Sequence, residues 1–182
     1  MSTIINGSSP SITFSDSTTQ TTAFTGSASQ ITSGTLPSAQ LPAGSVLQVV
    51  QGTLGTTVST ASSTYSDTGL TATITPKFST SKILVMITLA CCGKYSGNTS
   101  LALKVLRNGS QLLIWDDSFG YTATTAQITA QAALNYLDSP ATTSATTYKL
   151  QFSSISNVAN AIINNTNGTG GNSFITLMEI AG

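Results

Sequence analysis

Residues 101–115 read LALKVLRNGSQLLIW, two runs of strand-forming residues on either side of the pair Asn108-Gly109. A two-residue hairpin loop of type I′ needs positive φ at both positions, and Asn followed by Gly is among the pairs that adopt it most readily. The stretch therefore predicts a β-hairpin. Its Leu, Val and Ile residues indicate that both strands of the hairpin pack against a hydrophobic core.

Similar runs occur on both sides of the hairpin, separated by Gly, Pro, Ser and Asn residues that are typical of turns. They lie at residues 46–51, 69–75, 83–90, 126–137, 146–152, 159–163 and 173–180. No segment is a convincing helix, although the composition of residues 126–137 also suits one. We expect an all-β fold, an antiparallel β-sandwich of the jelly-roll type with about eight or nine strands.

Two of these runs carry a more detailed expectation. Residues 83–90 read ILVMITLA, a nearly continuous apolar run, which is typical of a strand that is covered on both faces. Residues 173–180 supply the last apolar run of the chain. We therefore expect this final strand to lie in the centre of its sheet.

The composition of the 182 residues argues against several classes of partner. Charged residues make up 7%, six basic and six acidic, against about 25% in a typical soluble domain. Lys and Arg are absent before Lys77, so no basic segment precedes it to neutralise the phosphates of a nucleic acid. No stretch approaches the roughly 18 apolar residues of a membrane span, and the N-terminus lacks the features of a secretory signal. We expect neither nucleic acid nor membrane as a partner.

Residues 1–44 differ from residues 45–182, which contain the strand runs and which we interpret as one folded head. The first segment is rich in Ser, Thr, Gly, Gln and Pro, and it is interpreted either as a flexible linker or as an extended arm that becomes ordered on a partner. We favour an anchoring arm, because isolated apolar residues have no use in a spacer. The candidate anchoring residues are Ile12, Phe14, Phe24, Ile31 and Leu36.

The residues that carry chemistry are few. The chain contains no His, so a Ser-His-Asp or Cys-His catalytic arrangement cannot form within it. The neighbouring acids Asp116 and Asp117 would face opposite sides of a strand, and we interpret them as the polar end of that strand. No phosphate loop, zinc-ligand spacing or calcium loop is present. We predict that the protein is not an enzyme and that it binds neither a cofactor nor a metal.

Cys91 and Cys92 are adjacent in the sequence. Neighbouring Cα atoms lie about 3.8 Å apart, closer than in most disulfides, and side chains alternate in direction along a strand. We interpret these residues as two reduced structural thiols. A vicinal redox switch or a pair of metal ligands is the alternative.

An aromatic cluster follows the hairpin, with Trp115, Phe119 and Tyr121 within a few residues of each other. Such clusters usually belong to a core or to a contact between subunits. Aromatic rings also stack on sugars, so a ligand-binding surface at these three residues is the second interpretation.

Two segments resemble parts of bacteriophage virion proteins. Residues 7–21, GSSPSITFSDSTTQT, resemble a motif that recurs in phage tail fibres and other virion proteins. Residues 33–50, SGTLPSAQLPAGSVLQVV, resemble the junction that leads into the C-terminal domains of such proteins. The remainder resembles the trimeric jelly roll of tumour-necrosis-factor and complement globular heads.

This resemblance implies a homotrimer in a phage particle, assembled in the host cytoplasm, with the heads around a three-fold axis and the arms at one end. The first role that fits is a capsid decoration or cement protein whose arms bind the major capsid protein. The second is a short tail fibre or tail-tip protein, joined to a tail or baseplate protein, whose head binds a host-surface glycan or protein. Exposed aromatic residues at the far end of the head would favour the second role, and a bare polar surface there the first. A secreted cytokine-like ligand is a third interpretation, against which the missing signal counts.

Overall fold

The computed structural model describes residues 4–5, 12–13, 15, 17, 19–20, 36–156, 159–165 and 171–182. The chain forms two compact units, Met1–Gln40 and Leu41–Gly182. In the first unit three two-residue strands pair antiparallel in the order β1 (Ile4–Ile5), β2 (Ile12–Thr13) and β3 (Thr19–Gln20), and a 3-10 turn, η2, covers Ser38–Gln40. No helix in the described ranges is long and apolar enough to cross a membrane.

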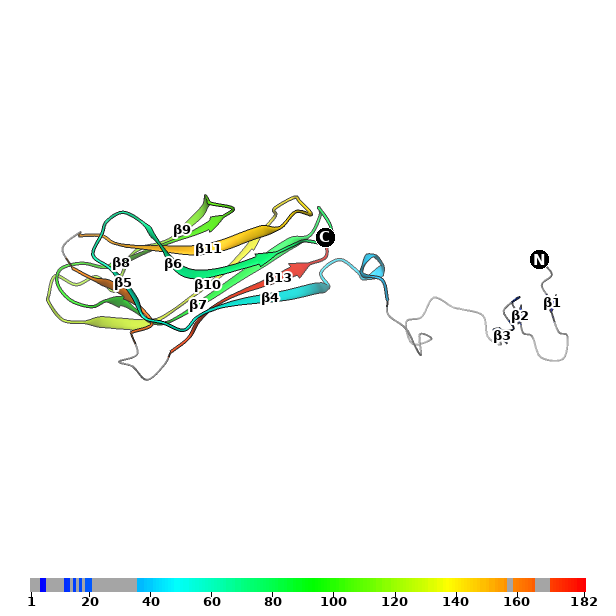
Figure 1. Cartoon of the computed structure of the whole chain (residues 1–182), viewed down its shortest axis with the longest axis horizontal. Helices are drawn as coiled ribbons and strands as arrows, with labels where there is room; N and C mark the ends of the chain where they lie inside the picture. The colour runs from blue at the N-terminus through cyan, green and yellow to red at the C-terminus, as the bar shows by residue number, and fades with distance from the viewer. Residues whose placement is uncertain are drawn as a thin grey trace. The chain divides into compact units, whose positions relative to one another are not determined.

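The second unit, which we call the head, is a sandwich of two antiparallel sheets (Figure 1). The first sheet has the order β4 (Val46–Leu54), β13 (Ser173–Ile180), β7 (Lys82–Lys94), β12 (Ala161–Ile163) and β5 (Val58–Thr60), and β10 (Ile128–Asp138) pairs with β7. The second sheet has the order β6 (Ser66–Ile74), β11 (Thr146–Ser154), β8 (Leu101–Arg107) and β9 (Ser110–Phe119). The predicted all-β, jelly-roll-like sandwich is confirmed.

The hairpin predicted at residues 101–115 forms between β8 and β9. Asn108 and Gly109 have φ of 50° and 83°, as a type I′ turn requires, and Arg107 pairs with Ser110. Each of the other predicted runs also contains a strand, and residues 126–137 contain β10 and no helix. The last strand, β13, lies between β4 and β7 and is central, as expected.

The core lies between the two sheets and is built from alternate residues of their strands. Because successive side chains on a strand point to opposite faces, each strand offers one row to the core. The fully enclosed apolar side chains include Leu70, Ile83, Val85, Ile87, Leu89, Leu101, Leu103, Val105, Tyr148, Leu150, Ile175 and Leu177. Strands β6, β7, β8, β11 and β13 therefore each direct Leu, Ile, Val or Tyr side chains into the core.

Strand β7 departs from its expectation. Its inward residues are enclosed, but within the described residues Leu84 and Met86 on the other face are only half-buried and Thr88 is exposed. The prediction that this strand is covered on both faces is therefore wrong for a single chain. The run is apolar on both sides, yet the head covers one side.

Candidate functional site

The head has two distinct ends. At one end, the base, the chain enters β4: the Gly44 N–H donates to the Ala181 carbonyl (2.8 Å), and the Ala181 N–H donates to the Ser45 carbonyl (2.9 Å). Strand β7 starts beside this point, since Lys82 pairs with Ile180, and runs for 13 residues, roughly 40 Å at about 3.3 Å per residue. The opposite end, which we call the tip, consists of the loops that follow β7, β9 and β11 (Figure 1).

A buried lysine joins two of the tip loops. Lys94, the last residue of β7, is 0% exposed, and its Nζ donates to the carbonyl oxygens of Gly97 (2.9 Å), Thr122 (3.0 Å) and Thr124 (2.5 Å). An ammonium group has three N–H donors, so these acceptors use all of them. Burying a charged group is costly unless it is hydrogen-bonded in this way. Lys94 thus fixes loop 95–100 against loop 120–127.

Three large apolar side chains are exposed on the tip. Tyr95 is 47% exposed, Tyr121 51% and Ile155 44%, one from each of the three loops. Tyr95 directly follows Lys94, and Tyr121 directly precedes Thr122, whose carbonyl Lys94 binds. The backbone of each tyrosine is also hydrogen-bonded, the Tyr95 N–H to the Asn160 carbonyl and the Tyr121 N–H to the Ser118 carbonyl. Exposed rings on fixed backbone are suited to stacking on a ligand.

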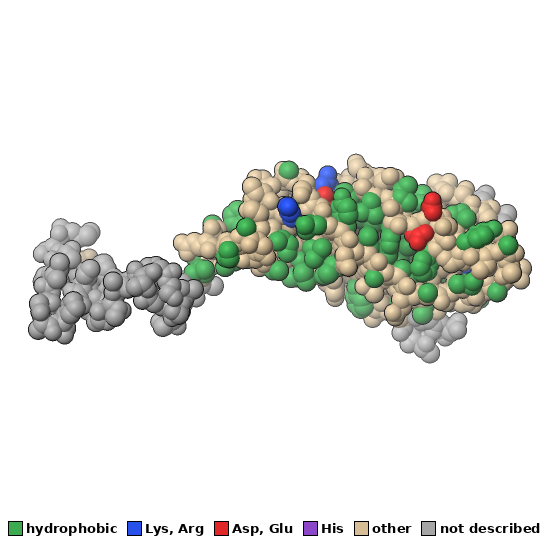
Figure 2. All heavy atoms as spheres, turned by 180° about the vertical axis from the view of Figure 1, so that it is seen from behind, with side chains coloured by type: hydrophobic (Ala, Val, Ile, Leu, Met, Phe, Trp, Pro, Cys, Tyr) green, Lys and Arg blue, Asp and Glu red, His purple; other side chains and the backbone are tan. Residues whose placement is uncertain are grey.

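The predicted aromatic cluster is therefore divided. Tyr121 lies on the tip, whereas Trp115 and Phe119 are half-buried and pack against the core. Trp115 lies in an irregularity of β9, because Lys104 pairs with Ile114 while its neighbour Leu103 pairs with Asp116. Figure 2 shows hydrophobic side chains both across the middle of the head and toward its tip.

Sequence reasoning missed Tyr95, Ile155 and the role of Lys94. The only local signal is the aromatic residue Tyr95, which directly follows a strand and precedes the polar loop sequence that begins at Ser96. That signal does not say which loops meet in space, because the loops that carry residues 95, 121 and 155 contact each other through strand order alone.

The cysteines and the neighbouring acids form no reactive pair in the structure. Both thiols are free, and burial raises the pKa of Cys92 to about 12, so this thiol stays protonated and unreactive at neutral pH. The charge of Asp116 acts on Cys92, inside the sandwich. On the outward side, burial first and then the charge of Asp117 raise the pKa of Tyr65. Across the described ranges, no three His, Cys, Asp or Glu residues are grouped closely enough to hold a metal ion.

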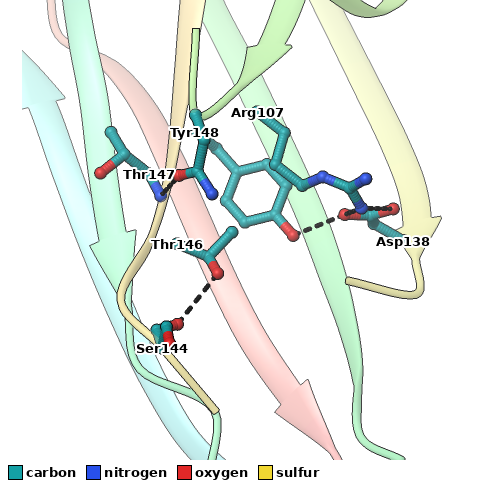
Figure 3. Close-up of polar contacts among 7 residues, drawn as sticks. Arg107, Asp138, Ser144, Thr146, Thr147 and Tyr148 are labelled. Carbon is teal, nitrogen blue, oxygen red and sulfur yellow. Dashed lines mark hydrogen bonds and ion pairs between the residues drawn. The ribbon is translucent and has the colours of Figure 1, made fainter. Parts of the chain in front are cut away.

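A polar cluster ties the two sheets together near the base (Figure 3). One Arg107 nitrogen donates to both carboxylate oxygens of Asp138 (2.9 and 2.8 Å), and the Tyr148 hydroxyl donates to the same carboxylate at 2.6 Å. Burial first, and then the bond to Asp138, raise the pKa of Tyr148. Asp138 belongs to the first sheet and its two partners to the second, so this cluster is a structural link between the layers.

A second enclosed carboxylate organises the base. Glu179 on β13 accepts hydrogen bonds from Gln48 Nε2 (2.6 Å) and from the Lys77 N–H (2.7 Å). Burial by itself raises the pKa of Glu179, but these and other hydrogen bonds outweigh it and hold the pKa below its ordinary value. The carboxylate therefore fixes the loop between β6 and β7 beside the point where the chain enters the head.

Of the five candidate anchoring residues, the structure describes one side chain. Leu36 is 39% exposed. Ile12 lies in β2, where only the backbone is described, and Phe14, Phe24 and Ile31 lie outside the described residues. Their role in attachment stays a prediction.

Comparison with known proteins found no family model that matches this chain and no curated protein with significant similarity to its sequence.

Proposed function

We propose that this chain is a non-enzymatic structural protein of a bacteriophage particle. In this proposal it forms a homotrimer that attaches to the particle through its N-terminal arm and decorates or cements the capsid. The observation that carries the proposal is the separation of the chain into a head, Leu41–Gly182, and a preceding unit. A separate segment in front of a closed sandwich suits attachment by the segment and display of the head.

The geometry of the base supports this arrangement. The chain enters the head next to its last residues, where Gly44 and Ser45 bond with Ala181. The tip and the outward sides of both sheets lie away from that point. An arm held on a particle would therefore leave all three of these surfaces free, either for neighbouring heads or for an external partner.

The exposed residues of the tip favour a second role. A short tail fibre or tail-tip protein needs a surface that binds a host glycan or protein, and Tyr95, Tyr121 and Ile155 offer apolar area at the end of the head that lies farthest from the base. Aromatic side chains contribute large contact areas with little loss of conformational freedom. This observation supports the tail role over a purely polar decoration surface.

Deletion of the arm tests the attachment step. We expect a variant that begins at Leu41 to fold and to keep its oligomeric state, because the head is a compact unit of its own. When it is supplied in place of the whole chain during particle assembly, it should be missing from purified particles. Incorporation at the normal level would refute attachment through the arm. A truncated protein that unfolds would show instead that residues 1–40 are part of the head.

A further inference from the structure

The outward sides of the two sheets differ sharply in charge. On the second sheet, Lys149 forms a 2.7 Å ion pair with Asp67, and Gln151 donates to the same carboxylate at 2.6 Å. Lys104 lies over the Tyr65 ring, 4.2 Å from its centre. This side has the mixed polar and charged character of a surface that faces water.

The outward side of the first sheet is apolar instead. Leu137 of β10 pairs with Leu84 of β7, Leu84 pairs with Met178 of β13, and Met178 pairs with Val49 of β4. Directly paired residues point to the same face, so these four side chains form one continuous row across four strands. Leu137 is 50% exposed and Val49 53%, and the two between them are half-buried. We call this outward side of β10, β7, β13 and β4 the apolar face.

The row next to it on the tip side is uncharged. Asn135, Met86, Thr176 and Gln51 form the next row, with Gln51 Nε2 donating to Thr176 Oγ1 at 2.9 Å. Among the side chains that these four strands direct outward, only Lys82, at the base, is charged. Asn, Gln and Thr each carry both donors and acceptors, so such a row can hydrogen-bond with a copy of itself.

We propose that the apolar face is the contact between copies of this chain in the homotrimer. A second copy fits better than a charged partner, because the rows through Leu84 and Met86 carry no charge, so copies that bring these rows together leave no charge buried and unpaired between them. The same contact accounts for strand β7, whose sequence is apolar on both sides although the single head covers only one. Depletion of charge is the composition expected at the centre of a protein interface.

The size of the face agrees with this use. Strands lie about 4.8 Å apart and advance about 3.3 Å per residue. Four strands over about seven residues therefore occupy roughly 450 Å² in projection, and the accessible area of projecting side chains is larger. A standard interface buries about 800 Å² per partner, and a face of this size with projecting side chains is of that order.

The three-fold symmetry rests on the proposed function, in which the N-terminal arms of all subunits attach to the same particle and must therefore lie on the same side of the trimer. Cyclic symmetry points every subunit the same way. With the strands of three apolar faces running along the axis, the three bases, each with its Gly44–Ala181 contact, would lie together at one end. The three tips would lie together at the other end.

The test measures the mass of the full chain in solution by sedimentation and light scattering. Wild type should be a trimer at micromolar concentration. The double variant Val49→Lys/Leu137→Lys places a charge at each end of the apolar row and should raise the dissociation constant at least about 100-fold, giving a monomer whose circular dichroism remains that of a β protein. The control Thr73→Lys, on an exposed position of the second sheet, should remain a trimer. A monomeric wild type, or a double variant that stays trimeric, would overturn the inference.

A second measurement needs no variant. Met86 and Met178 lie on the apolar face and are partly exposed in the single chain. Hydrogen peroxide should therefore oxidise them slowly in the trimer and quickly after dilution to monomer. Protection that persists in the monomer would place the chain's own N-terminal segment on the face and refute the contact between copies. Either result is independent of whether the protein is found in phage particles, so this inference and the proposed function can fail separately.

Discussion

Replacing Lys94 by Met should destabilise the head while leaving its shape almost unchanged. The Met side chain fills a similar volume but cannot donate to the carbonyls of Gly97, Thr122 and Thr124. A hydrogen bond to a charged group contributes about 1.5–3 kcal/mol, so three of them give a gross loss of roughly 5–9 kcal/mol. Relief of the burial cost of the ammonium group offsets several kcal/mol of this, and the loop carbonyls can regain water. We expect a net loss of about 2–3 kcal/mol in the free energy of unfolding.

Urea unfolding followed by the fluorescence of Trp115, the single Trp of the chain, measures this loss. The matched control is Lys77→Met, which removes an exposed lysine and should change the free energy of unfolding by less than about 0.5 kcal/mol. Hydrogen exchange should become faster in loops 95–100 and 120–127 of the Lys94 variant and stay unchanged in β7 and β13. Equal stability of the two variants, or uniform exchange throughout the head, would refute the role of Lys94 as a link between the tip loops.

Three further predictions concern the base, the hairpin and the tip. Glu179→Gln should lower the free energy of unfolding by about 1–3 kcal/mol at neutral pH. The pKa of Glu179 in the folded protein lies below the ordinary 4.5, so the carboxylate stabilises the fold above pH 4.5 and loses this effect as the pH falls through the folded pKa. The unfolding curves of wild type and variant should therefore converge in acid. Gly109→Ala should lower the free energy of unfolding, measured by thermal unfolding, by about 1 kcal/mol. The added Cβ meets no atom within 4 Å, but the alanine must adopt φ of 83°. No loss of stability would contradict the type I′ turn. If the tail role holds, Tyr95→Ser/Tyr121→Ser should leave the melting temperature unchanged and abolish adsorption of particles to host cells. The control Ile114→Ser, at an exposed position on β9, should not affect adsorption. Unchanged adsorption of the double variant would show that the tip does not bind the host.

The fold could be predicted because its determinants are local. Asn108-Gly109 specifies a hairpin through the φ values of two adjacent residues, and the apolar runs specify strands without knowledge of their partners. Strand β5, Val58–Thr60, was missed for the opposite reason. It has three residues and forms only by pairing with β12, so nothing in its own sequence marks it.

The candidate site was less predictable because it depends on which loops meet. Tyr121 was identified as a candidate, but Trp115 and Phe119 next to it pack against the core, and the other exposed apolar side chains of the tip, Tyr95 and Ile155, lie on other loops. Lys94 looks like an ordinary surface lysine in sequence. Only the crossing of the loops after β7 and β9 supplies the three carbonyls that allow it to be buried.

The apolar run at residues 83–90 shows a different limit of sequence reasoning. Its pattern indicates that both faces of the strand are buried, but it does not indicate whether the burying residues belong to the same chain. The head covers Ile83, Val85 and Ile87 and leaves Leu84 and Met86 half-open. Under the proposed contact between copies, the second apolar side of this strand is covered by another subunit.

The central claim, that this chain is a structural part of a phage particle, is tested most directly by counting it in purified particles. Quantitative mass spectrometry gives its copy number relative to the major capsid protein. The account predicts that the chain is present, either in a simple ratio to the shell subunit if it decorates the capsid or in a few copies that are a multiple of three if it belongs to the tail. Its complete absence from purified particles would contradict the account.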